Sequence, residues 1–241
     1  MNIVEVKNLT KNYGKNTAVD DISFEVQEKE IFALIGPNGA GKSTTLRVLA
    51  TLLSPSGGSA TIAGFDVHKQ ADKVREVISY LPEEAGAYKN LSGIGYFNFM
   101  AGLYFDDNHK RKEAVDFARE ISGLENRLKD KISTYSKGMS RKILLARTVM
   151  TKPKLAILDE PTSGLDVINA FAIRNIIKKL SEHGMSVLLS SHNMLEIEFL
   201  SDRVGLINKG KILEIGTSKQ LKEKYHANNL EEVFVKMVEE K

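Results

Sequence analysis

Cysteine is absent from the 241 residues of this chain, which excludes disulfide bonds and thiolate metal sites. A large excess of charge of either sign is also missing. The 34 lysine and arginine residues and the 31 aspartate and glutamate residues give a formal net charge of +3. That surplus is too small to indicate a nucleic-acid-binding protein by itself.

Long apolar stretches are missing as well. The longest uncharged run, residues 90–105, contains asparagine, serine and glycine, and it is shorter than the roughly 18 to 20 apolar residues that cross a bilayer. The first residues lack the apolar core of a secretory signal. We therefore expect a globular protein that does not cross a membrane by itself, although it could work beside one.

Three short apolar runs stand out against this background. They cover residues 31–35, 155–159 and 185–191, and runs of this kind are typical of strands that are buried on both faces. Helical patterns separate them, which predicts an α/β fold with a mostly parallel sheet. Alternating apolar residues between Ile3 and Val26 instead predict an N-terminal antiparallel β subdomain.

A block of helical patterns between the first and second apolar runs looks like an insertion into this fold. We expect one domain over residues 1–241. Its parts are a core with the β subdomain at 1–82 and 153–222, a helical subdomain at 83–152 and a C-terminal amphipathic helical tail at 223–241.

The strongest motif is GPNGAGKS at residues 36–43, which fits the phosphate-loop pattern G-x-x-x-x-G-K-[ST]. Glycines allow several backbone N–H groups to point at phosphate oxygens, and the helix that follows offers its positive end. Lys42 is expected to reach the β and γ phosphates, and the Ser43 hydroxyl to ligate Mg²⁺. The predicted nucleotide contacts are Gly36, Pro37, Asn38, Gly39, Ala40, Gly41, Lys42, Ser43 and Thr44.

Two further apolar runs end in residues that suit the same chemistry. LAILDE ends in Asp159, which suits the Mg²⁺ position, and in Glu160, a candidate base for an attacking water. Because side chains alternate along a strand, Glu160 should point away from Asp159. His192 follows the third apolar run and is expected at the same edge of the sheet, near the γ-phosphate. The other four histidines are expected to be solvated.

These motifs, in this order, resemble the nucleotide-binding subunit of an ATP-binding cassette (ABC) transporter over essentially the whole chain. The resemblance implies a P-loop NTPase core of the RecA-like kind, ATP and Mg²⁺ as ligands, and ATP hydrolysis that involves Glu160 and His192. It also implies that Tyr13 stacks on adenine and that SGLD, residues 163–166, lies at a dimer contact.

YSKGM, residues 135–139, falls where the family has its signature, usually LSGGQ; we call it the signature segment. In the family, two cassettes pair head to tail, so Ser136, Lys137 and Gly138 would contact the ATP of a second copy. Gly138 would allow close approach of its backbone to the phosphate, and a helix over residues 140–148 would aim its positive end there.

The signature departs from the family pattern at Tyr135, Lys137 and Met139, and a further departure is at Glu83. Lys137 replaces a glycine, and we leave open whether it strengthens phosphate binding or points to solvent. Glu83 replaces a glutamine that contacts Mg²⁺ and the attacking water. A glutamate oxygen can still ligate Mg²⁺, but its negative charge must be offset, for example by Lys42 or Lys137.

The resemblance implies partners as well as chemistry. The first partner is a second nucleotide-binding subunit, and we expect a homodimer. The second is an integral-membrane permease, which would place the chain as a peripheral protein on the cytoplasmic face of the cell membrane. No nucleic-acid partner is expected. The signature and Glu83 departures, with the short tail that contains LEEVF, resemble the efflux branch, which includes sodium-extrusion and drug-export systems. The aromatic stretch at residues 95–105 is expected to have an exposed minority that receives a permease helix. A soluble ABC ATPase without a permease, for example one serving metal-cluster assembly, is the alternative.

Overall fold

The computed structural model describes residues 1–239 and is built around a six-stranded sheet of order β10-β9-β3-β8-β7-β6. Its strands are β3 (Ile31–Ile35), β6 (Ile78–Leu81), β7 (Leu155–Asp159), β8 (Ser186–Ser191), β9 (Arg203–Asn208) and β10 (Lys211–Gly216). All pairs are parallel except β9 with β10, which form an antiparallel hairpin at one edge. The three predicted apolar strands are therefore confirmed as the centre of a mostly parallel sheet, since every residue of β3, β7 and β8 is buried.

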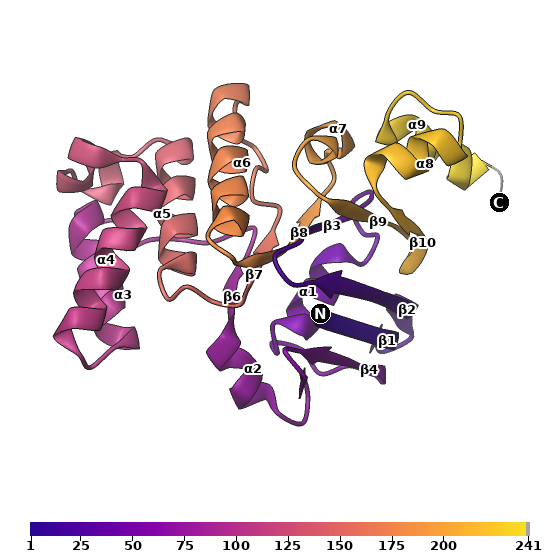
Figure 1. Cartoon of the computed structure of the whole chain (residues 1–241), viewed down its shortest axis with the longest axis horizontal. Helices are drawn as coiled ribbons and strands as arrows, with labels where there is room; N and C mark the ends of the chain where they lie inside the picture. Colours follow the sequence, from indigo (N-terminus) through magenta and orange to yellow (C-terminus); the bar gives the residue numbers. More distant parts are fainter. Residues whose placement is uncertain (240–241) are drawn as a thin grey trace.

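The N-terminal segment forms a separate four-stranded antiparallel sheet of order β2-β1-β4-β5, as predicted. Its strands are β1 (Asn2–Tyr13), β2 (Asn16–Gln27), β4 (Gly57–Ile62) and β5 (Phe65–Asp66). Alternating residues of β1 and β2 pack in one apolar core with α1 (Lys42–Leu49). The rings of Phe24 and Phe32 stack 5.5 Å apart and so join the two sheets. Helix α1 lies between the sheets in Figure 1.

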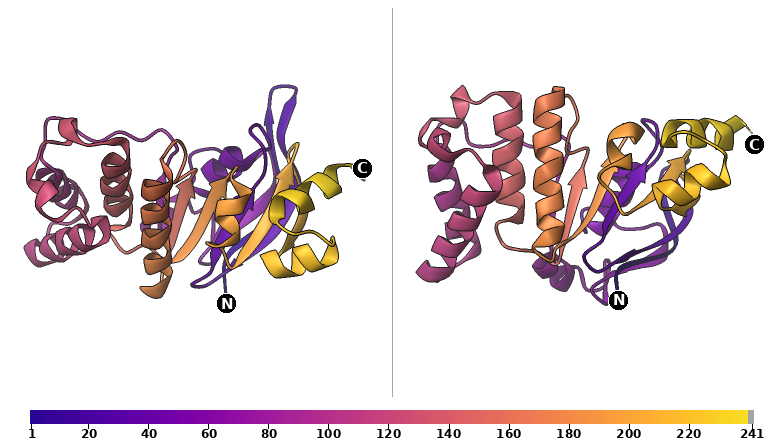
Figure 2. Two further views of the ribbon diagram at one scale, coloured as in Figure 1. Left: turned by 90° about the horizontal axis from the view of Figure 1, so that it is seen from above. Right: turned by 45° about the horizontal axis from the view of Figure 1, so that its top comes forward.

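The helical block lies at one end of the molecule, beyond α6 (Val167–Glu182), as Figures 1 and 2 show. It contains α3 (Gly93–Tyr104), α4 (Asn108–Ser122), α5 (Lys137–Val149) and two short 3₁₀ helices, η1 (Glu125–Lys129) and η2 (Ile132–Thr134). Helix α2 (Ala71–Val77) precedes β6. Helix α5 begins at Lys137, within the signature segment, and not at residue 140, because the Ser136 side chain caps it by accepting a hydrogen bond from the Met139 N–H at 3.2 Å.

The C-terminal part carries three further helices: α7 (Met194–Glu198), α8 (Ser218–Lys224) and α9 (Leu230–Glu239). The predicted helical tail is present as α9, which buries Leu230, Val233 and Met237; residues 240–241 of the tail lie outside the described residues. Helix α8, which the sequence did not indicate, spans the expected boundary between residues 222 and 223. Figure 2 places α8 and α9 at the end of the molecule opposite the helical block. No helix within residues 1–239 combines the length and the hydropathy that crossing a bilayer requires.

Candidate nucleotide-binding and hydrolysis site

The phosphate loop joins β3 to α1, and glycine is required at two of its positions. Gly41 has φ +102°, a left-handed conformation that side chains disfavour. A Cβ atom on Gly41 would also collide with the main-chain oxygen of Ala18, and one on Gly36 with that of Ile207. The N–H groups at the start of α1 carry the positive end of the helix dipole. The loop therefore has the backbone conformation and the positive electrostatic potential that favour phosphate binding.

Lys42 is buried at the first position of α1, where its ammonium group is fully engaged. Its Nζ donates to the carbonyl oxygens of Gly36 at 2.8 Å and Pro37 at 3.1 Å, and it lies 3.4 Å from Oε1 of Glu160. The Lys42 and Glu160 side chains are 5% and 6% exposed. The folded chain thus holds the Lys42 ammonium group against the phosphate loop and the Glu160 carboxylate beside that ammonium group.

Asp159 lies at the carboxyl end of β7, as predicted, and it is fully buried. Its Oδ1 accepts from the hydroxyl groups of Ser43 at 2.9 Å and Ser190 at 2.6 Å, and its Oδ2 accepts from the Tyr80 hydroxyl at 3.3 Å. Burial and the Asp159 carboxylate raise the pKa of Tyr80 to about 12, so this hydroxyl stays protonated and donates. A carboxylate and a hydroxyl beside a phosphate loop are oxygen ligands of the kind that Mg²⁺ takes.

Glu160 follows β7 directly and adopts a left-handed backbone conformation with φ +46°. It points toward different groups from Asp159, as expected, but strand alternation is not the reason, because the strand ends at Asp159. Its N–H donates to the Ser190 hydroxyl at 3.0 Å. The strained backbone turns the Glu160 carboxylate toward Lys42, where the phosphate loop begins its helix.

His192 completes a short chain of polar contacts at this sheet edge. Its Nδ1 lies 2.8 Å from Oε2 of Glu160, and its side chain is 47% exposed. When Nδ1 carries the proton of a neutral ring, it donates to Glu160 and leaves Nε2 as an acceptor toward solvent. The other histidines, His68, His109, His183 and His226, are exposed, as predicted.

A cleft of about 400 Å³ collects most of the residues that the sequence singled out. It is lined by Tyr13, Asn38, Gly39, Ala40, Gly41, Lys42, Ser43, Thr44, Glu83 and Glu160, together with Asn16 and Ala18. Tyr13 is 46% exposed at the rim of the cleft, and the Lys11 ammonium group lies 5.4 Å from the centroid of the Tyr13 ring. The Glu83 carboxylate accepts from the Ser163 hydroxyl at 3.2 Å. Residues that were predicted separately to contact adenine, phosphate and metal thus line one cleft.

The signature segment does not line this cleft among the described residues. Helix α5 lies on the other side of α6 from α1 in both figures. Ser136 is exposed, whereas Gly138 is buried within the chain, where a Cβ atom would collide with the side chain of Asn169 on α6. The glycine therefore has a packing role inside the chain that the sequence did not reveal. The Lys137 ammonium group lies close to Gly164 of the SGLD segment, on an exposed surface.

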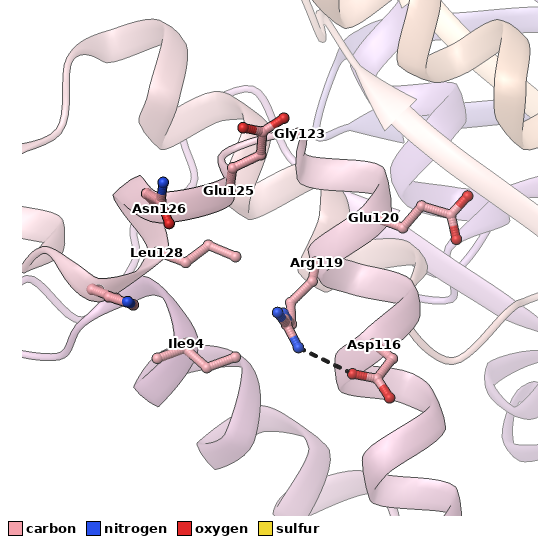
Figure 3. A pocket seen from close by; sticks show the side chains of 9 residues that line it. Ile94, Asp116, Arg119, Glu120, Gly123, Glu125, Asn126 and Leu128 are labelled. Atoms are coloured by element: carbon pink, nitrogen blue, oxygen red, sulfur yellow. Dashed lines mark hydrogen bonds and ion pairs between the residues drawn. The ribbon is translucent and has the colours of Figure 1, made fainter.

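A second cleft, of about 750 Å³, lies between α3, α4 and η1 in the helical block (Figure 3). Its Asp116 and Arg119 side chains form an ion pair of 3.3 Å at the surface. None of the predicted site residues lines it. It is larger than the cleft beside Lys42 but offers no comparable phosphate-binding loop, so the chemistry and not the size identifies the candidate site.

Besides Asn16 and Ala18, three residues that support the site were not predicted from the sequence. Ser190 and Tyr80 donate hydrogen bonds to Asp159, and Arg141 contacts the carbonyl oxygens of Glu160 and of the residues before and after it. Ser190 and Tyr80 lie within strands, and the sequence of these strands indicates burial but no polar contact. Arg141 is one of several cations in STYSKGMSRK, and nothing local distinguishes it from a surface arginine.

The chain is similar to known proteins in both sequence and fold. A family model described as ABC transporter matches residues 19–163. The chain is 39% identical over 219 residues to the linearmycin resistance ATP-binding protein LnrL of Bacillus subtilis, which covers 91% of this chain and 70% of that protein. A solved structure of an ATP-binding subunit of an ABC transporter has a TM-score of 0.85 at 28% identity and covers 98% of this chain and 99% of that one.

The ATP-binding cassette MJ0796, in a dimeric post-hydrolysis state bound to ADP and Pi, has a TM-score of 0.77 at 22% identity, covering 89% of this chain and 98% of that one. This last likeness concerns the fold alone. Together the matches show that the chain belongs to the ABC transporter family. It is an ATP-binding, ATP-hydrolysing subunit, and the transporter relatives favour transport over the soluble ATPase that the sequence left open.

Proposed function

We propose that two copies of this chain pair head to tail and hold each ATP between the cleft of one copy and the signature segment of the other. The observation that carries the proposal is the separation of the two halves within one chain: Lys42 lines the cleft, whereas Ser136 is exposed at the start of α5, beyond α6. Helix α5 has 13 residues, enough to present a positive N-terminal end to a phosphate. The dimeric state of the MJ0796 cassette supports such pairing.

Hydrolysis, in this proposal, depends on the three groups that converge beside the phosphate loop. Glu160 orients and polarises the attacking water, His192 contacts the γ-phosphate, and Lys42 balances charge on the transferred group. Ser43 and Asp159, with Glu83, would hold Mg²⁺, which when bound supplies positive charge against the β and γ phosphates. The 2.8 Å contact between His192 and Glu160 would fix the carboxylate while leaving the second ring nitrogen free.

We further propose that the subunit drives export through a separate permease at the cytoplasmic face of the membrane. The relatives support this direction by their names: a linearmycin resistance protein, a bacitracin transport protein and a probable multidrug transporter protein. Residues 83–152 would then act as the helical subdomain that receives the permease.

The docking groove we propose for the permease is a cleft of about 610 Å³ between the helical block and the core. Tyr104 and Phe105 line it, and the Tyr104 side chain is 47% exposed. Two polar atoms at the groove, Ser79 Oγ and Arg147 Nε, are buried without a hydrogen-bond partner among the described residues. Such donors could satisfy the free carbonyl groups at the end of a short permease helix.

Replacing Tyr104 with aspartate should lower the amount of permease that co-purifies with the subunit by about tenfold or more, because a charge would be buried against an apolar partner. ATP hydrolysis by the isolated subunit should stay within about two-fold. Phe199→Asp is the matched control, since Phe199 is an exposed aromatic on the C-terminal side of α7 and is 75% exposed. Unchanged co-purification of Tyr104→Asp would remove the groove from the account.

A further inference from the structure

Arg141, on the second turn of α5, is 8% exposed, yet its guanidinium group contacts no carboxylate by hydrogen bond. Every nitrogen donates instead to main-chain carbonyl oxygens. Nε donates to Pro161 at 2.8 Å, Nη1 to Pro82 at 3.2 Å and Glu83 at 3.0 Å, and Nη2 to Asp159 at 3.1 Å and Glu160 at 2.8 Å. Five donors in one rigid plane thus meet five acceptors.

The acceptors belong to two segments that are far from Arg141 in sequence. One segment is Asp159–Glu160–Pro161, which leaves β7, and the other is Pro82–Glu83, which leaves the neighbouring parallel strand β6. Both segments carry the carboxylates that we place at the nucleotide. A single side chain of the helical block therefore ties α5 to the catalytic edge of the sheet at two points.

Burying a charged guanidinium group costs free energy that burying an apolar side chain does not. We therefore expect Arg141 to have a role that an apolar side chain could not fill. Burial lowers the pKa of the Arg141 guanidinium, and the charges of Glu83, Asp159 and Glu160 oppose that shift. Glu160 itself needs support, because its left-handed backbone is unfavourable for a residue with a side chain. The bond from Nη2 to the Glu160 carbonyl oxygen and the bond from the Glu160 N–H to Ser190 hold the peptide groups on both sides of this residue.

We propose that Arg141 is a positioning residue for hydrolysis: it fixes the backbone of Glu160 and Glu83 and links both to the helix that begins with Ser136. The inference rests on the proposed pairing of two copies. The signature segment of one chain would bind the partner's ATP. Through α5 and the Arg141 hydrogen bonds, this binding would affect the position of the same chain's Glu160. Arg141 is not among the residues that line the cleft beside Lys42, so its proposed role is indirect.

The test compares Arg141→Lys and Arg141→Gln in the full chain, with ATP turnover and nucleotide binding measured separately. Lysine keeps the charge but has one ammonium group, which cannot span both segments. We expect kcat to fall about 10- to 100-fold in both variants. The Kd for a fluorescent ATP analogue should change less than about two-fold, because Arg141 lies outside the cleft. The Hill coefficient for ATP should fall toward about 1 if α5 couples the two sites.

Lys142→Gln is the matched control, because it removes one positive charge at the next position of the same helix, and it should keep the kcat of the unmodified protein. Wild-type kcat in Arg141→Lys would overturn the proposal, because charge alone would then suffice. A parallel fall of kcat, ATP affinity and melting temperature in both variants would also overturn it, because Arg141 would then support only the fold. If Glu160→Gln retained turnover, the proposed role of Glu160 in hydrolysis would fail. If only the Arg141 variants retained turnover, this inference alone would fail.

Discussion

Glu160→Gln is expected to lower the rate of phosphate release from ATP by about 100- to 10,000-fold, the range that general-base groups contribute. The structure gives the reason: the Glu160 carboxylate is buried between Lys42 and His192, at 3.4 Å and 2.8 Å, with its backbone fixed on both sides. Glutamine keeps the shape but cannot accept a proton from water. ATP affinity should not fall, because the change removes a negative charge near the phosphates.

Phosphate release and binding of a fluorescent ATP analogue measure the two effects separately. Glu120→Gln, an exposed position on α4 beside the cleft of Figure 3, is the control and should match the unmodified protein. Near-normal turnover in Glu160→Gln would remove Glu160 from its proposed role and leave His192 as the remaining candidate.

Lys42→Met is expected to weaken ATP binding itself, in contrast to Glu160→Gln. Removing one partner of a buried charge-assisted contact costs about 2 to 5 kcal/mol, which corresponds to a loss of affinity of roughly 30- to 4,000-fold. Lys42 is 5% exposed and stands at the start of α1, and its ammonium already contacts two loop carbonyl groups. Methionine fills the same space without the charge.

Titration with a fluorescent ATP analogue measures the affinity of Lys42→Met, and circular dichroism checks that it folds, because the change also leaves Glu160 with one fewer cation. Lys110→Met, on the exposed surface of α4, is the charge-matched control. Unchanged affinity for ATP in Lys42→Met would contradict the assignment of the loop as the phosphate site.

Much of the fold followed from local pattern. The apolar runs that became β3, β7 and β8 are buried along their whole length, and such strands leave a continuous signal in the sequence. The phosphate loop was equally clear, because its glycines are needed for backbone reasons at Gly36 and Gly41. Short elements such as α7 and α8, with five and seven residues, leave no comparable signal.

The parts of the candidate site that could not be predicted are long-range contacts between polar groups. Arg141 binds carbonyl groups 18 to 59 residues away, and main-chain acceptors leave no mark on the residue types around them. The sequence explains Gly138 only by close approach of its backbone to a phosphate. The structure adds a second reason, because the Asn169 side chain leaves no room for a Cβ atom there. The left-handed turn at Glu160 was invisible because glutamate gives no hint of positive φ.

The central claim is that the signature segment acts on the ATP of a second copy, and Ser136→Asp tests it with little disturbance of the chain. Aspartate caps a helix as well as serine does and suits its positive end, so α5 should keep its start. Its negative charge would instead repel a phosphate of the partner's ATP. Ser92→Asp is the matched control, because Ser92 caps α3 in the same way, through the Gly95 N–H.

The measurement is the ATP-dependent change in mass by size-exclusion chromatography with light scattering, in the Glu160→Gln background that retains ATP. We predict that ATP converts Glu160→Gln and Glu160→Gln/Ser92→Asp to dimers. Glu160→Gln/Ser136→Asp should stay monomeric while it binds ATP with an affinity within about two-fold of Glu160→Gln. A dimer of normal stability in the Ser136→Asp variant, or a large loss of ATP affinity in its monomer, would contradict the account.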